Sequence, residues 1–216
     1  MAENTLQFEW IVTIKEGLDH LSAADPNVFV AGDLFWYPLE GRPEVRMAPD
    51  VMVVFGRPKG HRPSYLQWEE GGIPPQVVFE VLSPGNRAGE MVRKAEFYRR
   101  YGAEEYYIYN PDPSRLELSG FLREGEALVE VPRMDGHVSP RLGVRFEMGD
   151  EGLRLIGPGG QRLLTYQEWT RRAEQERQRA EAADRRAEEE RARAEQAIGE
   201  VERLRERLRS LGQDPA

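Results

Sequence analysis

The stretch "QVVFEVLSP", residues 76–84, decides the fold of the chain. Its apolar residues fall on both sides of an extended backbone: Val77, Val78, Phe79, Val81 and Leu82. A strand that is apolar on both faces is typical of the buried centre of a sheet. Glu80 interrupts this run. Because an unpaired carboxylate is costly in such a place, we expect Glu80 to be neutral, paired or bound to a metal.

The residues that follow predict how this strand connects to the next one. "GEMVRKAEFYRRYG", residues 89–102, places Met91, Ala95 and Tyr98 on one helical face and ends in a glycine, a common helix terminator. "EYYIYNPD", residues 105–112, then predicts a strand ended by a turn. A strand, a helix and a strand in this order indicate a right-handed crossover between parallel strands.

The remaining periodicities complete a mixed α/β domain. Apolar residues at helical spacing predict a helix over about 7–22. Alternating or short apolar runs predict one or two strands in 27–38, a strand in 48–55, and short antiparallel strands at 116–122, 127–131 and 152–156. "GPGG", residues 157–160, reads as a hairpin turn, because it lacks the Lys-Ser/Thr of a phosphate-binding loop.

Composition excludes several classes of protein. The chain of 216 residues has no cysteine, which excludes disulfides and thiolate metal sites, and its three widely spaced histidines argue against a zinc cluster. Neither a signal peptide nor an apolar run of about 20 residues is apparent, so we expect a cytoplasmic protein without a membrane partner. The net charge of −8 argues against broad non-specific binding of nucleic acid, although it does not exclude a local basic groove.

The C-terminal part has a different pattern. From Trp169, steps of four and three residues reach thirteen positions, eleven of them apolar and mostly alanine. Such a repeat predicts a coiled-coil helix over 166–211, followed by a disordered end at 212–216. The pattern favours self-association, most simply as a homodimer held mainly by Val201 to Leu211. A long single helix in solvent is the alternative.

Two further residues have the chemistry to share the environment of Glu80. Asp50 begins the strand "PDVMVVF", and Lys94 borders the apolar face of the helix after Glu80. Two carboxylates offer hard oxygen ligands to Mg²⁺ or Mn²⁺, and a lysine can stabilise developing charge beside them. Each residue also has a structural interpretation: Glu80 paired with a buried arginine, Asp50 capping a turn, and Lys94 lying along the surface.

The segments "PDVMVVF", "VVFEVLSP" and "K..FY..YG..EYYIYNPD" together resemble the PD-(D/E)XK nuclease superfamily, in particular its restriction-endonuclease-like, Uma-type branch. The resemblance covers about residues 5–165 and implies an endonuclease-like domain over 1–165. The implied fold is a restriction-endonuclease-like mixed sheet flanked by helices, here followed by the long coiled-coil helix.

The resemblance also implies roles for individual residues. Asp50 and Glu80 match the acidic metal ligands of the motif, with the carbonyl of Val81 as a third ligand. The motif lysine would stand at Leu82, and in this branch it is moved to the following helix, where Lys94 lies. Asp33, in "AGDLFWY", resembles an upstream acidic position and is a further catalytic candidate; Glu16 on the first helix is a weaker one.

A basic segment could contact DNA. "GRPKGHRPSYLQW", residues 56–68, is rich in proline and glycine and is therefore expected to be a loop. It combines Arg57, Lys59 and Arg62 with Tyr65 and Trp68, and cations beside aromatic rings suit phosphate contact and base stacking. An ordinary solvated loop is the alternative.

Two functions are compatible with these patterns. The first is a Mg²⁺- or Mn²⁺-dependent endonuclease that hydrolyses DNA, with Asp50, Glu80, Lys94 and Asp33 in its site. The second is a catalytically inactive nuclease-like domain that acts as a coiled-coil assembly or interaction module. The acidic body and the absence of lysine at position 82 favour the second.

Overall fold

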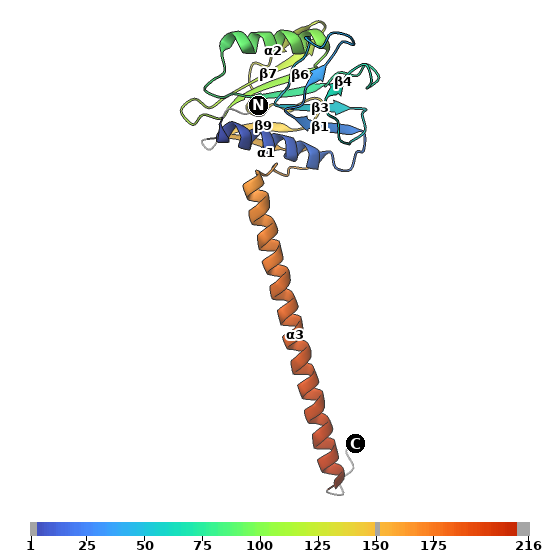
Figure 1. Cartoon of the computed structure of the whole chain (residues 1–216). Helices are drawn as coiled ribbons and strands as arrows, with labels where there is room; N and C mark the ends of the chain where they lie inside the picture. Colours follow the sequence, from blue (N-terminus) through green and yellow to red (C-terminus); the bar gives the residue numbers. More distant parts are fainter. Residues whose placement is uncertain (1–3, 150–151, 211–216) are drawn as a thin grey trace. The chain divides into compact units, whose positions relative to one another are not determined.

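The computed structural model describes residues 4–149 and 152–210 of the chain. The chain divides into two compact units, with the boundary after Tyr166. In the first unit, a six-stranded sheet lies between the helices α1 (Thr5–Leu21) and α2 (Ala88–Tyr101) (Figure 1). The second unit is the helix α3 (Tyr166–Ser210).

The sheet has the strand order β1-β3-β5-β6-β7-β8. β5 pairs with β6 in parallel and the other neighbours pair antiparallel, so α2 is the crossover between two parallel strands. All five residues of β5 are buried, which confirms the central strand predicted from its apolar faces. The strands are β1 (Val28–Gly32), β3 (Val51–Phe55), β5 (Val77–Val81), β6 (Glu105–Asn110), β7 (Glu117–Glu124) and β8 (Ala127–Glu130).

Each face of the sheet has its own hydrophobic core. One core packs α1 against the sheet and includes the hairpin of β9 (Arg145–Gly149) and β10 (Gly152–Ile156). The other packs α2 against the opposite face. It also includes residues of the short parallel pair β2 (Trp36–Tyr37) and β4 (Tyr65–Leu66). The predicted mixed α/β fold with a long C-terminal helix is therefore confirmed.

Two details differ from expectation. β9 was not predicted, because its sequence "RFEMG" alternates too weakly to stand out as a strand. The segment 56–68 is not entirely a loop, since Tyr65 and Leu66 form β4. Their pairing with β2 is a tertiary contact between segments about 30 residues apart, which no local pattern reports.

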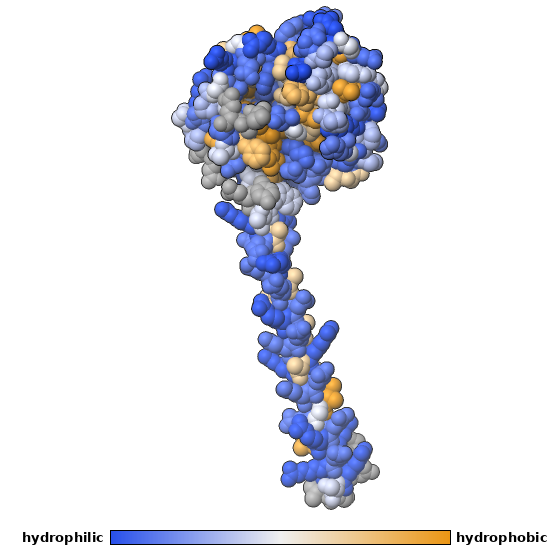
Figure 2. Space-filling model, in the orientation of Figure 1, coloured by the Kyte–Doolittle hydropathy of each residue, from blue (hydrophilic) through white to orange (hydrophobic). Residues whose placement is uncertain are grey.

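α3 is 45 residues long and strongly charged. Figure 2 shows it as mostly hydrophilic, with small hydrophobic spots along its length and larger ones toward its C-terminal end. These larger residues are 37–60% exposed: Ile198, Val201, Leu204 and Leu208. The last predicted seam residue, Leu211, and the predicted disordered end at 212–216 lie outside the described residues. Among the described helices, none combines the length and apolarity needed to cross a membrane.

Candidate active site

Strand register places three acidic residues in one row. β1 pairs Gly32 with Val51, and β3 pairs Val51 with Phe79. Continuing this antiparallel register by one residue pairs Asp33 with Asp50 and Asp50 with Glu80. The three acids therefore follow one another across the sheet. The backbone N–H of Asp33 donates to the carbonyl of Asp50 over 3.2 Å, which continues the β1–β3 pairing into this row.

Glu80 is almost completely buried, with 2% of its surface exposed. Lys94 donates from Nζ to Oε2 of Glu80 over 2.7 Å, and the hydroxyl of Tyr98 donates to Oε1. Burial raises the pKa of Glu80 to about 8, and the charge of the facing Asp50 adds to this rise. Glu80 therefore binds a proton more readily than an ordinary glutamate, despite its two donors.

Asp50 lies directly before β3 and is 7% exposed. Its Oδ2 accepts a hydrogen bond of 2.7 Å from the backbone N–H of Val81, so one of its oxygens is fixed against β5. Burial raises the pKa of Asp50, while the Val81 N–H and the charge of Lys94 oppose the rise. Two buried carboxyl groups with raised pKa values thus face each other across β3 and β5.

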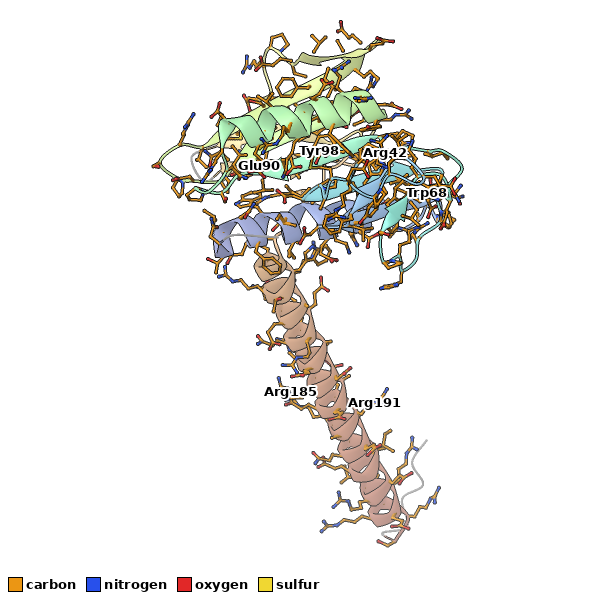
Figure 3. The ribbon with its side chains drawn as sticks, turned by 45° about the horizontal axis from the view of Figure 1, so that its top comes forward. Arg42, Trp68, Glu90, Tyr98, Arg185 and Arg191 are labelled. Carbon is orange, nitrogen blue, oxygen red and sulfur yellow. The ribbon has the colours of Figure 1, made fainter. Side chains whose placement is uncertain are left out.

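α2 supplies the cation of the site. Lys94 and Tyr98 are four residues apart, so they lie on the same face of the helix, and both reach Glu80. Figure 3 labels Tyr98 on α2 together with Glu90, whose carboxylate is 3.9 Å from the Lys94 ammonium. Burial alone would lower the pKa of Lys94, but the carboxylate of Glu80 raises it above the ordinary value. Lys94 is therefore charged and directed into the sheet.

Two site residues were missed from the sequence. Gln7 is buried on α1, and its Nε2 donates to the carbonyl of Val81 over 2.7 Å. This is the carbonyl that the family resemblance implies as a metal ligand, so one of its acceptor positions is already used. Tyr98 was assigned only to the apolar face of α2. Its position four residues after Lys94 was a usable signal, whereas nothing in the sequence marks Gln7.

Asp33 has different surroundings from the buried pair. Asp33 is exposed and has φ of 48°, in the left-handed region, so the chain turns away from the sheet there. Together with Lys15 and Glu16 of α1 it lines a surface hollow of about 810 Å³. The structure thus brings the backbone of Asp33 to the site and places its side chain, like that of Glu16, in the neighbouring hollow.

The cations of segment 56–68 already have acidic partners. Arg57 and Arg62 both bind Glu70, at 2.8 and 2.5 Å, and Lys59 binds Asp19 at 3.0 Å. A phosphate at this loop would therefore replace carboxylates rather than meet free cations. Tyr65, expected to be available for base stacking, is instead completely buried.

Glu105 provides a comparison for Glu80. It lies on the adjacent parallel strand β6 and is also 2% exposed. Its carboxylate accepts hydrogen bonds from Tyr107 at 2.9 Å, from the backbone N–H of Arg141 at 2.6 Å, and from Ser139. None of these partners is an acid, and the hydrogen bonds of Glu105 connect β6 to residues 139–141. Glu80, by contrast, faces a second carboxyl group.

The donor set fits a small divalent cation. Asp50 and Glu80 offer hard oxygen ligands from adjacent strands, and two facing carboxylates gain most from a cation between them. In the described ranges, no group of three or more His, Cys, Asp or Glu residues is arranged for a metal. An ion at this site would draw on these two carboxylates, with the Val81 carbonyl as a further oxygen beside them.

Comparison with known proteins gives this geometry a context. Residues 10–148 match the family Uma2, whose description is "Putative restriction endonuclease". A solved structure described as a putative nuclease belonging to DUF820 from Anabaena variabilis is 11% identical, with a TM-score of 0.46, over 65% of this chain and 74% of that one. Comparison with curated proteins gives no match. The matched residues span most of the chain and include Asp33, Asp50, Glu80 and Lys94, and the chain therefore belongs to the Uma2 family.

Proposed function

We propose that the protein is a Mg²⁺- or Mn²⁺-dependent endonuclease that hydrolyses phosphodiester bonds of DNA. The observation that carries the proposal is the placement of Asp50 and Glu80 opposite each other on adjacent buried strands, with Lys94 bound to Glu80. Family membership supports nuclease chemistry in general, and this site supports its metal dependence.

Each residue of the site would have a role set by its chemistry. Asp50 and Glu80 would hold the ion, which when bound polarises the phosphodiester and lowers the pKa of a water ligand. Val81 presents its carbonyl beside them, and Gln7 holds that carbonyl in place. Lys94 would stabilise the negative charge that develops on the phosphate during attack. Attack of water on phosphorus breaks one P–O bond, which leaves a phosphate on one fragment and a hydroxyl on the other.

Plasmid nicking tests this proposal. Purified protein with Mg²⁺ or Mn²⁺ should convert supercoiled plasmid to open-circular and linear forms. Asp50→Ala and Glu80→Gln should abolish the conversion, and Lys94→Met should slow it by about 100-fold or more, because one electrostatic donor is lost. Glu130→Gln, on the exposed edge strand β8, is the matched control and should cut at the normal rate. Equal nicking by Asp50→Ala and the unchanged protein would overturn the proposal.

A second function has its own support. Both oxygens of Glu80 accept hydrogen bonds from donors within the chain, and Leu82 stands where the motif lysine is expected. A nuclease-like domain that has become an assembly module would have such a closed site. Calorimetric titration with Mn²⁺ separates the two functions. If neither the unchanged protein nor Glu80→Gln binds Mn²⁺ detectably, the assembly module is favoured.

The partners follow from the same proposal. DNA is the substrate, and contacts through Arg57, Lys59 and Arg62 stay a prediction, since these cations have carboxylate partners in the free protein. The exposed apolar residues of α3 support self-association of two copies in a homodimeric coiled coil. A DNA substrate is consistent with action in the cytoplasm.

A further inference from the structure

α3 contains a strict seven-residue repeat. Arg-Ala-Glu occurs at 172–174, 179–181, 186–188 and 193–195, each time seven residues after the last. The structure makes this whole segment one continuous helix, with nearly every residue from Arg171 to Ser210 exposed. On a straight helix the stripe formed by such a repeat drifts by about 20° per heptad, so it stays against a partner only when the two helices supercoil around each other.

The repeat defines the seam and its flanks. Alternate spacings of three and four residues assign Ala173, Ala180, Ala187, Ala194, Val201 and Leu208 to position a, and Glu176, Ala183, Glu190, Ala197 and Leu204 to position d. Positions g and e flank this seam. Position g is arginine at five of six places, the exception being Glu200, and position e carries Arg177, Asp184, Arg191, Ile198 and Arg205.

The charged residues at positions g and e suit a parallel pair of helices. In a parallel, in-register pair, each g residue faces the e residue five places later on the other helix, and the two enclose one d position. Opposite charges face each other around two apolar d residues: Arg179 and Asp184 around Ala183, and Glu200 and Arg205 around Leu204.

Like charges face each other at two places, and both have an acid between them. Arg172 and Arg177 enclose Glu176, and Arg186 and Arg191 enclose Glu190. These are the two glutamates of the seam, and Arg172 already binds Glu176 within the single helix at 3.2 Å. The remaining set, Arg193 and Ile198 around Ala197, has no like-charge contact.

An antiparallel pair would lose this matching. There, g residues face g residues and e residues face e residues, so the arginines of position g would lie against one another along most of the helix. The charge pattern therefore selects the parallel arrangement.

We propose that α3 binds α3 of a second copy of this chain as a parallel, in-register coiled coil. This inference rests on the self-association proposed above and adds its polarity, its register and its charge pairs. Parallel pairing joins the two copies at the same end of their helices, whereas antiparallel pairing would separate the attachment points by roughly 65 Å, the length of α3 at about 1.5 Å per residue.

Cysteine cross-linking tests the polarity, because the natural chain contains no cysteine. Ala197→Cys places one thiol at a d position of the seam, and Ala192→Cys places one on the outer face as the matched control. Under a glutathione redox buffer, the full-length Ala197→Cys protein should form a disulfide dimer nearly completely, and Ala192→Cys should remain mostly reduced. A dimer by light scattering without Ala197→Cys cross-linking would overturn the polarity but not the self-association. A monomer, or equal cross-linking of both variants, would overturn both.

Charge reversal tests the register. Arg179→Glu and Asp184→Arg should each weaken the dimer about tenfold or less, and the double variant should recover the unchanged dissociation constant. Residues five apart are not neighbours on one helix, so recovery requires contact between two chains. Absence of recovery in sedimentation measurements contradicts the proposed register. None of these readouts depends on cleavage of DNA, so failure of the nuclease proposal would leave this inference standing.

Discussion

Tyr98 and Tyr106 are buried tyrosines of the same core cluster, but their hydroxyls have different surroundings. Tyr98 donates to Glu80, whereas the hydroxyl of Tyr106 has no hydrogen-bond partner among the described residues. We expect Tyr98→Phe to lower the free energy of unfolding by about 1–3 kcal/mol, because a buried carboxyl loses a donor. Tyr106→Phe should cost little or stabilise slightly. Urea unfolding of both variants checks this, and equal losses would contradict the role of Tyr98.

The pKa of Glu80 predicts a pH dependence of stability. Its pKa is 4.5 when unperturbed and about 8 in the folded protein. Between these values the unfolded chain releases a proton that the folded protein keeps, so the free energy of unfolding falls as pH rises, by up to about 1.4 kcal/mol per pH unit. Glu80→Gln lacks this dependence. Urea unfolding at several pH values between about 5 and 8, with a chelator present, should show the unchanged protein losing stability relative to Glu80→Gln as pH rises, and a constant difference would refute the assignment.

The candidate site could be predicted in its composition but not in its bonding. The acid in an apolar strand and the second acid before the neighbouring strand indicated Glu80 and Asp50, because an isolated charge is costly there. Contacts made by Gln7 and Tyr98 depend on how α1 and α2 dock on the sheet, which local patterns do not report. Glu105 was overlooked because it lies at the start of an aromatic run and its partners come from residues 139–141.

At the scale of elements, two helical glycines have opposite environments. A Cβ on Gly17 of α1 would lie 2.8 to 3.0 Å from side-chain atoms of Leu163, whereas one on Gly89 of α2 would meet only the end of Arg93, at 4.0 Å. Alanine favours a helix over glycine by about 1 kcal/mol, but overpacking costs about 1–3 kcal/mol. We expect Gly17→Ala to destabilise the protein and Gly89→Ala to stabilise it slightly, as measured by thermal unfolding. Stabilisation by both substitutions would show that the side chain of Leu163 can move aside at little cost.

The elements that were predicted correctly are those with long or two-sided patterns. α1, α2 and β5 have clear periodicities and appear within one or two residues of their expected bounds. β4 has two residues and pairs with the distant β2, so sequence alone could not place it, and β9 alternates too weakly to stand out as a strand. The packing of α1 and α2 on opposite faces likewise follows from the assembled cores rather than from any single segment.

At the scale of the whole molecule, metal binding should stabilise the fold if Asp50 and Glu80 hold an ion. Binding to the folded state alone adds about 2.7 kcal/mol when the free metal is at 100 times its dissociation constant. We expect Mn²⁺ to raise the melting temperature of the unchanged protein and of the surface control Glu130→Gln, but not of Asp50→Ala. The rise should grow with pH up to about 8, as Glu80 loses its proton. A metal-independent melting temperature would contradict the site.

The chain contains few lysines, so the reactivity of its lysine amines can report on the site. Its lysines are Lys15, Lys59 and Lys94, and arginine supplies every other cationic side chain. The side chains of Lys15 and Lys59 are 29% and 34% exposed, whereas Lys94 is 13% exposed and bound to Glu80. A lysine-directed acylating reagent therefore has three side-chain targets, of which Lys94 is the most protected. Its rate of modification, followed by mass spectrometry, measures how often the ion pair between α2 and β5 opens.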